Sequence, residues 1–140
     1  MEALLKYNNI MDAAKYMTGV QHIGIPTNDI DKTITFYQRL GFTIAYQTVN
    51  EKANERVAFL QFGNLIIETY ENHAATLRSG AIDHLAIDVK EIDRLYEEIK
   101  TAGFHILDDS VQYLPFWEKG VKFFTILGPN EEKVEFCERL

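Results

Sequence analysis

The chain has 140 residues, 46% of them hydrophobic, so it can form one domain with a sizeable core but has little room for a second. Its 14 basic and 21 acidic residues give a net charge of -7, which argues against a nucleic-acid partner because phosphate backbones require clustered Lys and Arg. Cys137 is the only cysteine and excludes both an intrachain disulfide and a thiolate zinc cluster. With no apolar run of membrane-spanning length and no secretory pattern at its start, we expect a cytoplasmic protein without a membrane partner.

The first eighteen residues predict a helix outside the pattern that organises the rest of the chain. Apolar side chains recur there at helical intervals, at Ala3, Tyr7, Ile10, Ala14 and Met17. The segment carries no group suited to chemistry beyond exposed charge. We therefore interpret residues 1–18 as a helical extension that packs on the domain or contacts a second chain.

A strand, a helix and three further strands are expected next. Residues 20–26 alternate between apolar and polar side chains, which indicates a half-buried strand. Residues 29–40 carry apolar side chains at helical spacing, with Asn28 or Asp29 as the N-cap and Gly41 at the end. Three strand-like runs follow, over residues 43–49, 56–62 and 65–70.

The same order of elements returns after a polar linker, residues 72–80, which includes Gly80. The spacing then predicts a strand, a helix and three strands over residues 82–89, 91–102, 105–113, 120–127 and 132–137. We therefore expect an α+β protein in which one domain, residues 19–138, contains two tandem βαβββ modules, 19–71 and 81–138.

The two modules are similar in sequence as well as in the order of their elements. Residues 20–42 align with residues 82–104 without a gap, and this alignment matches His22 with His84. Near the end of each module, FGNLIIETYE resembles LGPNEEKVEFCE, which matches two pairs of acidic residues, Glu68 with Glu135 and Glu71 with Glu138. A histidine on the first strand and a glutamate on the last strand therefore recur in both modules.

These repeated polar residues are expected to form a metal site. Their strand neighbours of opposite parity are apolar, so helices would cover that face and leave His22, Glu68, His84 and Glu135 on the open one. A strand glutamate that recurs in both modules needs a common cause, and a bound cation supplies one. Two imidazoles and two carboxylates suit one divalent ion per site, with Zn or Ni first and Co, Mn or Fe as alternatives.

Two segments resemble a known superfamily. DIDKTITFYQRLGF, after a His-bearing strand, and TILGPNEEKVEF, near the end, look like signatures of the vicinal oxygen chelate superfamily. Its members include glyoxalase I, methylmalonyl-CoA epimerase, extradiol dioxygenases, fosfomycin-resistance enzymes and bleomycin-binding proteins. The resemblance covers about residues 19–138 and implies a U-shaped metal cleft of mixed sheets, together with a homodimer. Sites shared between two chains and sites within one chain both occur in relatives and both remain open here.

Glu68 decides which members the chain resembles most. Dioxygenases and fosfomycin-resistance enzymes need no acid at this position, epimerases typically carry Gln, and glyoxalase I carries Glu. The resemblance therefore implies a glyoxalase I-like (lactoylglutathione lyase-like) metal-dependent lyase or isomerase. Such an enzyme transfers a proton next to a carbonyl through a metal-bound enediolate, with Glu68 and Glu135 as candidate catalytic residues. The alternatives are an epimerase of the methylmalonyl-CoA epimerase type and a non-catalytic small-molecule-binding or resistance protein.

The expected substrate is a small α-oxygenated carbonyl compound or its thiol adduct. Glutathione-handling relatives share an Arg four residues beyond the first His, where this chain has Pro26. Other residues resemble substrate contacts of glyoxalase I, carry positive charge or could wall a pocket: Arg56, Asn72, Trp117, Lys119 and Lys122. His73 and His105 have no partner in the repeat, and we interpret both as surface residues.

Overall fold

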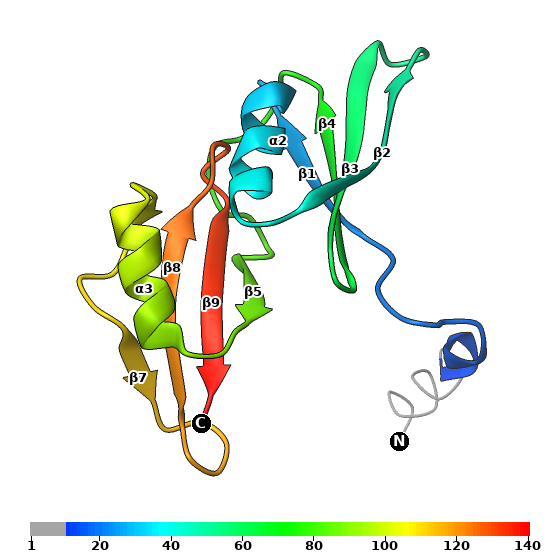
Figure 1. The fold of residues 1–140 in the computed structure, drawn as a ribbon. Helices are drawn as coiled ribbons and strands as arrows, with labels where there is room; N and C mark the ends of the chain where they lie inside the picture. Colours follow the sequence, from blue (N-terminus) through cyan, green and yellow to red (C-terminus); the bar gives the residue numbers. More distant parts are fainter. Residues whose placement is uncertain (1–10) are drawn as a thin grey trace.

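The first module is a four-stranded mixed sheet with one helix packed on it (Figure 1). The computed structural model describes residues 11–140. The elements of this module are β1 (Ile23–Thr27), α2 (Ile30–Arg39), β2 (Thr43–Asn50), β3 (Glu55–Phe62) and β4 (Leu65–Glu71). The strand order is β1-β4-β3-β2, in which β1 is parallel to β4 and the other neighbours are antiparallel.

The second module repeats this plan. Its elements are β5 (His84–Asp88), α3 (Ile92–Thr101), β6 (His105–Ile106), β7 (Gln112–Leu114), β8 (Val121–Leu127) and β9 (Lys133–Arg139). The strand order is β5-β9-β8-β6, with β7 also paired with β8, and β5 and β9 form the parallel pair that corresponds to β1 and β4. The predicted α+β arrangement of two βαβββ modules is confirmed.

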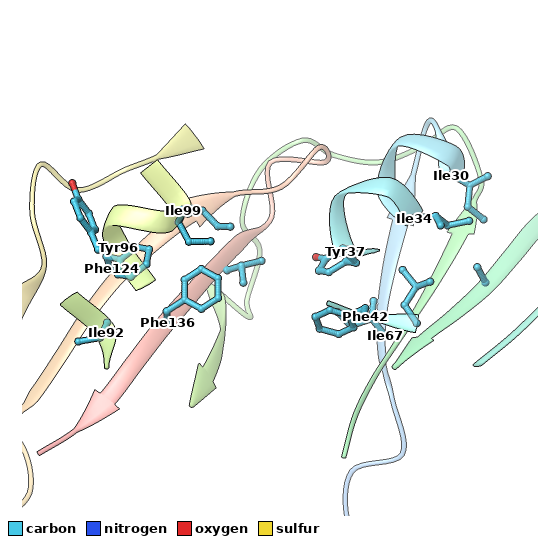
Figure 2. Packing of buried hydrophobic residues seen from close by; sticks show 14 residues of the cluster. Ile30, Ile34, Tyr37, Phe42, Ile67, Ile92, Tyr96, Ile99, Phe124 and Phe136 are labelled. Atoms are coloured by element: carbon cyan, nitrogen blue, oxygen red, sulfur yellow. The ribbon is translucent and has the colours of Figure 1, made fainter. Parts of the chain in front are cut away.

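Each helix covers one face of the sheet in its own module. The buried side chains of α2 and α3 recur at helical spacing and meet strand residues on that face, and Figure 2 shows both groups. Burial of each large apolar side chain contributes about 1.5–3 kcal/mol to folding. The labelled members are Ile30, Ile34, Tyr37, Phe42 and Ile67 around α2, and Ile92, Tyr96, Ile99, Phe124 and Phe136 around α3.

A glutamate at the end of each module accepts the first N–H group of that module's helix. The Glu71 carboxylate accepts the Ile30 N–H at 2.8 Å, and the Glu138 carboxylate accepts the Ile92 N–H at 3.0 Å. Both isoleucines are buried, so water cannot replace these acceptors, and the negative charge suits the positive end of the helix dipole. This contact explains why the repeat alignment matches Glu71 with Glu138.

Polar side chains join α2 to the turn between β8 and β9, which fixes the two modules against each other. The Asn130 side-chain amide donates a hydrogen bond to the Thr33 hydroxyl at 3.0 Å. The Tyr37 hydroxyl donates to the Glu132 carboxylate at 3.0 Å. Burial, together with the neighbouring negative charge of Glu132, raises the pKa of Tyr37 well above its usual value.

The predicted strand over 105–113 is divided into β6 and β7. Asp108 causes this division because its carboxylate, rather than a strand backbone, accepts the Thr125 N–H at 2.8 Å. The Asp108 carbonyl is also drawn toward α3, where it accepts the Tyr96 hydroxyl at 3.1 Å. The periodicity of the sequence does not show where a side chain, instead of the backbone of a neighbouring strand, accepts a hydrogen bond.

The predicted N-terminal helix is not confirmed. Residues 1–10 lie outside the described part of the chain, and Met11–Lys15 forms a short 3₁₀ helix. Among the helices of residues 11–140, none is long and apolar enough to cross a membrane.

Substitution of Glu71 tests its contact with α2. Glu71→Ala leaves the Ile30 N–H buried without an acceptor, so we expect the free energy of unfolding to fall by about 1–3 kcal/mol. Glu71→Gln keeps an acceptor oxygen and loses the charge at the helix terminus, which is worth about 0.3–1 kcal/mol. Urea denaturation measures both changes, with the exposed Glu97→Ala on α3 as the control. A Glu71→Ala loss no larger than that of the control would contradict this role.

Candidate metal centre

The first module brings His22 and Glu68 together on the face that α2 leaves open. Ile67 and Thr69 are fully buried, so the pleat of β4 directs Glu68 to the opposite side. His22 directly precedes β1, and its Nε2 atom lies 3.7 Å from Glu68 Oε1. The His22 ring also packs edge-to-face on Phe59, with 5.8 Å between ring centroids. Both polar side chains remain partly exposed, at 34% and 28%.

The second module repeats this arrangement with His84 and Glu135. β9 buries Val134 and Phe136 beneath α3, which places Glu135 on the open face between them. His84 opens β5, and its Nε2 atom lies 3.1 Å from Glu135 Oε2. The side chain of His84 is 45% exposed and that of Glu135 is 17% exposed, so this pair is also reachable from solvent.

The residue before each histidine holds the other ring nitrogen. Gln21 Oε1 lies 2.9 Å from His22 Nδ1, and Asp83 Oδ2 lies 2.9 Å from His84 Nδ1. The other Asp83 oxygen accepts the Lys133 ammonium at 3.2 Å, and the contacts with His84 and Lys133 lower the pKa of Asp83. Sequence reasoning missed Gln21 and Asp83, although the offset that matches the histidines also matches these two hydrogen-bonding residues.

The spacing of the donor atoms in each pair fits a metal ion. Two donors that each lie about 2.1 Å from a tetrahedral ion are about 3.4 Å apart, and the observed separations of 3.7 and 3.1 Å lie on either side of that value. In both pairs the histidine presents Nε2, and its Nδ1 atom already has a partner. Imidazole nitrogen and carboxylate oxygen are together suitable ligands for divalent first-row metals.

The four predicted ligands form two separate pairs within one chain. Among residues 11–140, no group of three or more His, Cys, Asp and Glu side chains is close enough to hold an ion. The pairs belong to different sheets, and a cavity of about 250 Å³ lies between β1 and β5, lined partly by the linker. We call His22 with Glu68 the first half-site and His84 with Glu135 the second half-site. Convergence of all four side chains on one ion stays a prediction.

Arg56 and Lys122 lie on the helix-covered sides of their sheets. The Arg56 guanidinium donates two hydrogen bonds to the Asp31 carboxylate, at 2.8 and 3.0 Å, and Lys122 contacts Asp93 at 2.9 Å. Both aspartates belong to the first turn of a helix, so the two ion pairs occupy equivalent places in the modules. The hydrogen bonds from Arg56 also lower the pKa of Asp31. Neither cation points toward a half-site.

The other predicted substrate contacts lie in loops. Asn72 accepts the Ala74 N–H at 2.9 Å and so closes a turn in the linker. Trp117 and Lys119 are exposed in the loop between β7 and β8. The Arg139 guanidinium lies 4.2 Å from the centre of the Trp117 ring, which is a cation–π contact. The structure brings none of these three predicted residues into the His–Glu pairs.

The remaining histidines and the cysteine have no contact that indicates catalysis. His73 and His105 are exposed, as predicted. Cys137 lies on the same side of β9 as Glu135, and partial burial together with the negative charges of Glu135 and Asp88 raises the pKa of its thiol. The thiolate that a nucleophile requires is therefore disfavoured.

Comparison with protein families gives a match over most of the chain. The model of the Glyoxalase/Bleomycin resistance protein/Dioxygenase superfamily matches residues 19–136. Among curated proteins, the uncharacterized protein YwbC of Bacillus subtilis (strain 168) is 28% identical over 125 residues, which cover 86% of this chain and 97% of YwbC.

Several solved structures share the fold. The glyoxalase family protein from Enterococcus faecalis has a TM-score of 0.75 at 19% identity, covering 88% of this chain and 99% of that one. The fosfomycin resistance protein FosX from Listeria monocytogenes, solved with Mn(II) and sulfate ion, has a TM-score of 0.69 at 17% identity and covers 89% and 94%. Glyoxalase I from Zea mays has a TM-score of 0.68 at 22% identity, covering 85% of this chain and 44% of that one. At these identities the likeness establishes the fold alone.

The ion pair between Arg56 and Asp31 predicts a change in titration. Arg56→Gln removes the positive charge that favours the ionised Asp31 carboxylate, so the Asp31 pKa should rise toward its ordinary value of 3.8. NMR titration of the aspartate side chains measures this rise. Lys52→Gln, which alters an exposed cation in the turn before β3, should leave the Asp31 pKa in place. An unchanged Asp31 titration in Arg56→Gln would remove the ion pair and return Arg56 to the substrate candidates.

Proposed function

The chain belongs to the glyoxalase/bleomycin resistance protein/dioxygenase superfamily, and on this premise we propose that it is a metal-dependent isomerase or lyase of the glyoxalase I type. It moves a proton on a carbon next to the carbonyl of a small α-oxygenated compound or of its thiol adduct. One observation carries the proposal. Each module presents a histidine Nε2 and a glutamate oxygen on its open face, 3.7 and 3.1 Å apart, which is the spacing of neighbouring metal ligands.

The complete site forms between two copies of the chain. The first half-site of one copy faces the second half-site of the other, and the two-fold symmetry of a homodimer produces two such sites. The separation of the half-sites into two sheets supports this assembly, because one chain supplies only two of the ligands at either place. Tyr46, which is 60% exposed and packs on Phe59 next to His22, provides apolar surface beside the first half-site that a second copy would cover.

Glu68 and Glu135 carry out the proton transfer. The two histidines and two glutamates would hold a divalent cation, which would supply Lewis acidity that stabilises negative charge on the substrate oxygens. One carboxylate takes the proton from the carbon and the other returns it from the opposite side. Both carboxylates are partly exposed at the open faces, where a small substrate can reach them. Phe59, which packs against His22, and Phe123, which pairs with Cys137 on β9, would provide apolar walls beside the half-sites.

Epimerisation of an acyl thioester is a second candidate function. The observation that favours it is Pro26, which lies in β1 opposite Tyr70 and provides no positive charge for a glutathione carboxylate. The proton chemistry is the same in both reactions, so the two differ in the groups that hold the substrate. A hemithioacetal isomerisation assay and an acyl-thioester epimerisation assay on the same metal-loaded sample distinguish them. A metal-free protein that binds a small molecule without converting it would contradict both.

Replacement of Glu68 tests the chemistry. Glu68→Gln keeps the size of the side chain and removes its basicity, so we expect the rate to fall by about 10²–10⁴-fold while the fold is retained. The assay that detects wild-type activity measures the rate, and circular dichroism with thermal unfolding checks the fold. Glu51→Gln, an exposed glutamate in the turn between β2 and β3, is the matched control. Full activity of Glu68→Gln would exclude Glu68 from the mechanism.

Complementation between chains tests where the site forms. His22→Ala and His84→Ala chains are co-expressed with different tags, and the heterodimer is purified through both tags. If sites are shared, one of the two sites in the heterodimer has both substitutions and the other has none. We therefore expect one tightly bound ion per heterodimer by elemental mass spectrometry, compared with two per wild-type dimer.

The homodimers of each single variant are the comparison for the heterodimer. Each site in a His22→Ala or a His84→Ala homodimer lacks one ligand, so both should hold the ion weakly. The exposed His105→Ala substitution should leave two ions per dimer. A heterodimer that binds no more metal than its parents would place the complete site within one chain.

A further inference from the structure

We propose that Gln21 and Asp83 are positioning residues that fix the orientation and the tautomer of the two metal-binding histidines. This inference rests on the proposed function, since it concerns the same site. Its premise is that the contact between a side-chain oxygen and histidine Nδ1 occurs twice, at the same place in each module and with the same length of 2.9 Å.

Such a contact determines which ring nitrogen is available to a metal ion. A neutral imidazole carries one N–H group, and an acceptor beside Nδ1 keeps the proton there. The lone pair then remains on Nε2, the atom that faces Glu68 in the first module and Glu135 in the second. Metal-binding histidines in general donate their other N–H to such an acceptor, which also raises the basicity of the ligand.

The exposure of the two rings makes this control necessary. His22 is 34% exposed and His84 is 45% exposed, so burial alone does not hold either ring at one χ2 angle. A turned ring would direct Nε2 away from the glutamate. A hydrogen bond from Nδ1 to the neighbouring acceptor prevents the ring from turning, but it requires that the acceptor side chain is itself ordered. In the second module Lys133 orders Asp83 through a contact of 3.2 Å.

The two modules differ in the charge of the acceptor. Asp83 is a carboxylate and Gln21 is a neutral amide, and a charged acceptor forms a stronger hydrogen bond with imidazole. Asp83 should therefore contribute more to metal affinity than Gln21. The second half-site also has the shorter distance between histidine and glutamate, 3.1 Å compared with 3.7 Å. We infer that the second half-site holds its histidine the more firmly.

A surface ion pair between Asp83 and Lys133 is the alternative explanation for the position of Asp83. The two explanations differ for a variant that removes the cation and keeps the acceptor. If Asp83 serves only the ion pair, Lys133→Gln should have the same effect as Asp83→Ala. If Asp83 positions His84, Lys133→Gln should retain most of the metal affinity because the oxygen beside Nδ1 remains.

The experiment measures Zn²⁺ affinity of the dimeric full-length protein by competition with a chromophoric chelator. Asp83→Ala should weaken binding about 10–100-fold, the range found when such outer partners of metal-binding histidines are removed. Asp83→Asn retains an acceptor oxygen and should recover part of this loss, while Gln21→Ala should cause a smaller loss than Asp83→Ala. Asp109→Ala, an exposed aspartate between β6 and β7, serves as the matched control.

A second readout does not depend on metal binding. Nitrogen-15 NMR of the metal-free protein reports which nitrogen of His84 carries the proton. Because the Glu135 carboxylate also lies beside Nε2, the measurement is made in the Glu135→Ala variant, where we expect the proton on Nδ1 and a shift toward Nε2 when Asp83→Ala is added. If Asp83→Ala and Gln21→Ala both bind Zn²⁺ with an affinity within twofold of the wild type, the inference is overturned and the proposed function stays in place. The expected tautomer in Glu135→Ala, together with wild-type protein that binds no Zn²⁺, would overturn the proposed function alone.

Discussion

The burial of one face of each sheet beneath a single helix is the constraint on which the candidate site depends. Side chains alternate along a strand, so the same strands that bury Ile67 and Val134 under α2 and α3 must direct Glu68 and Glu135 to the other side. No second helix of residues 11–140 covers that other side (Figure 1). The carboxylates therefore stay within reach of solvent and of a ligand.

The repeat extends from the fold to individual polar contacts. The alignment that pairs the histidines also pairs Gln21 with Asp83, and both of these hold a histidine Nδ1 atom. It pairs Glu71 with Glu138, and both accept the first N–H of a helix. These contacts separate the repeated acidic residues into two kinds. One glutamate of each module supports its helix, and the other, three residues earlier in the strand, faces the open side as a candidate ligand.

Local patterns in the sequence predicted the elements, whereas contacts between distant residues decided where the prediction failed. Alternation and helical spacing located the two helices and all strands except residues 105–113, where the Asp108 side chain replaces a backbone partner. The open-face position of Glu68 and Glu135 followed from parity alone. Arg56 shares the parity of the buried Ala58 and Leu60, so its helix side also follows from alternation, whereas its ion pair with Asp31 is a contact between distant residues that parity does not reveal. The relation between the half-sites also lay beyond the sequence, since the contact of Asn130 with Thr33 sets how the modules pack.

In the proposed assembly, half-sites from two different chains hold one ion. Native mass spectrometry of Zn²⁺-reconstituted protein, recorded over a dilution series that spans dimer and monomer, distinguishes this assembly from a site within one chain because it counts ions separately in each species. We expect two ions on the dimer and none on the monomer, since a single chain offers only two ligands at each place. A monomer that retains one ion would contradict the shared site and would place all four ligands around a site within one chain.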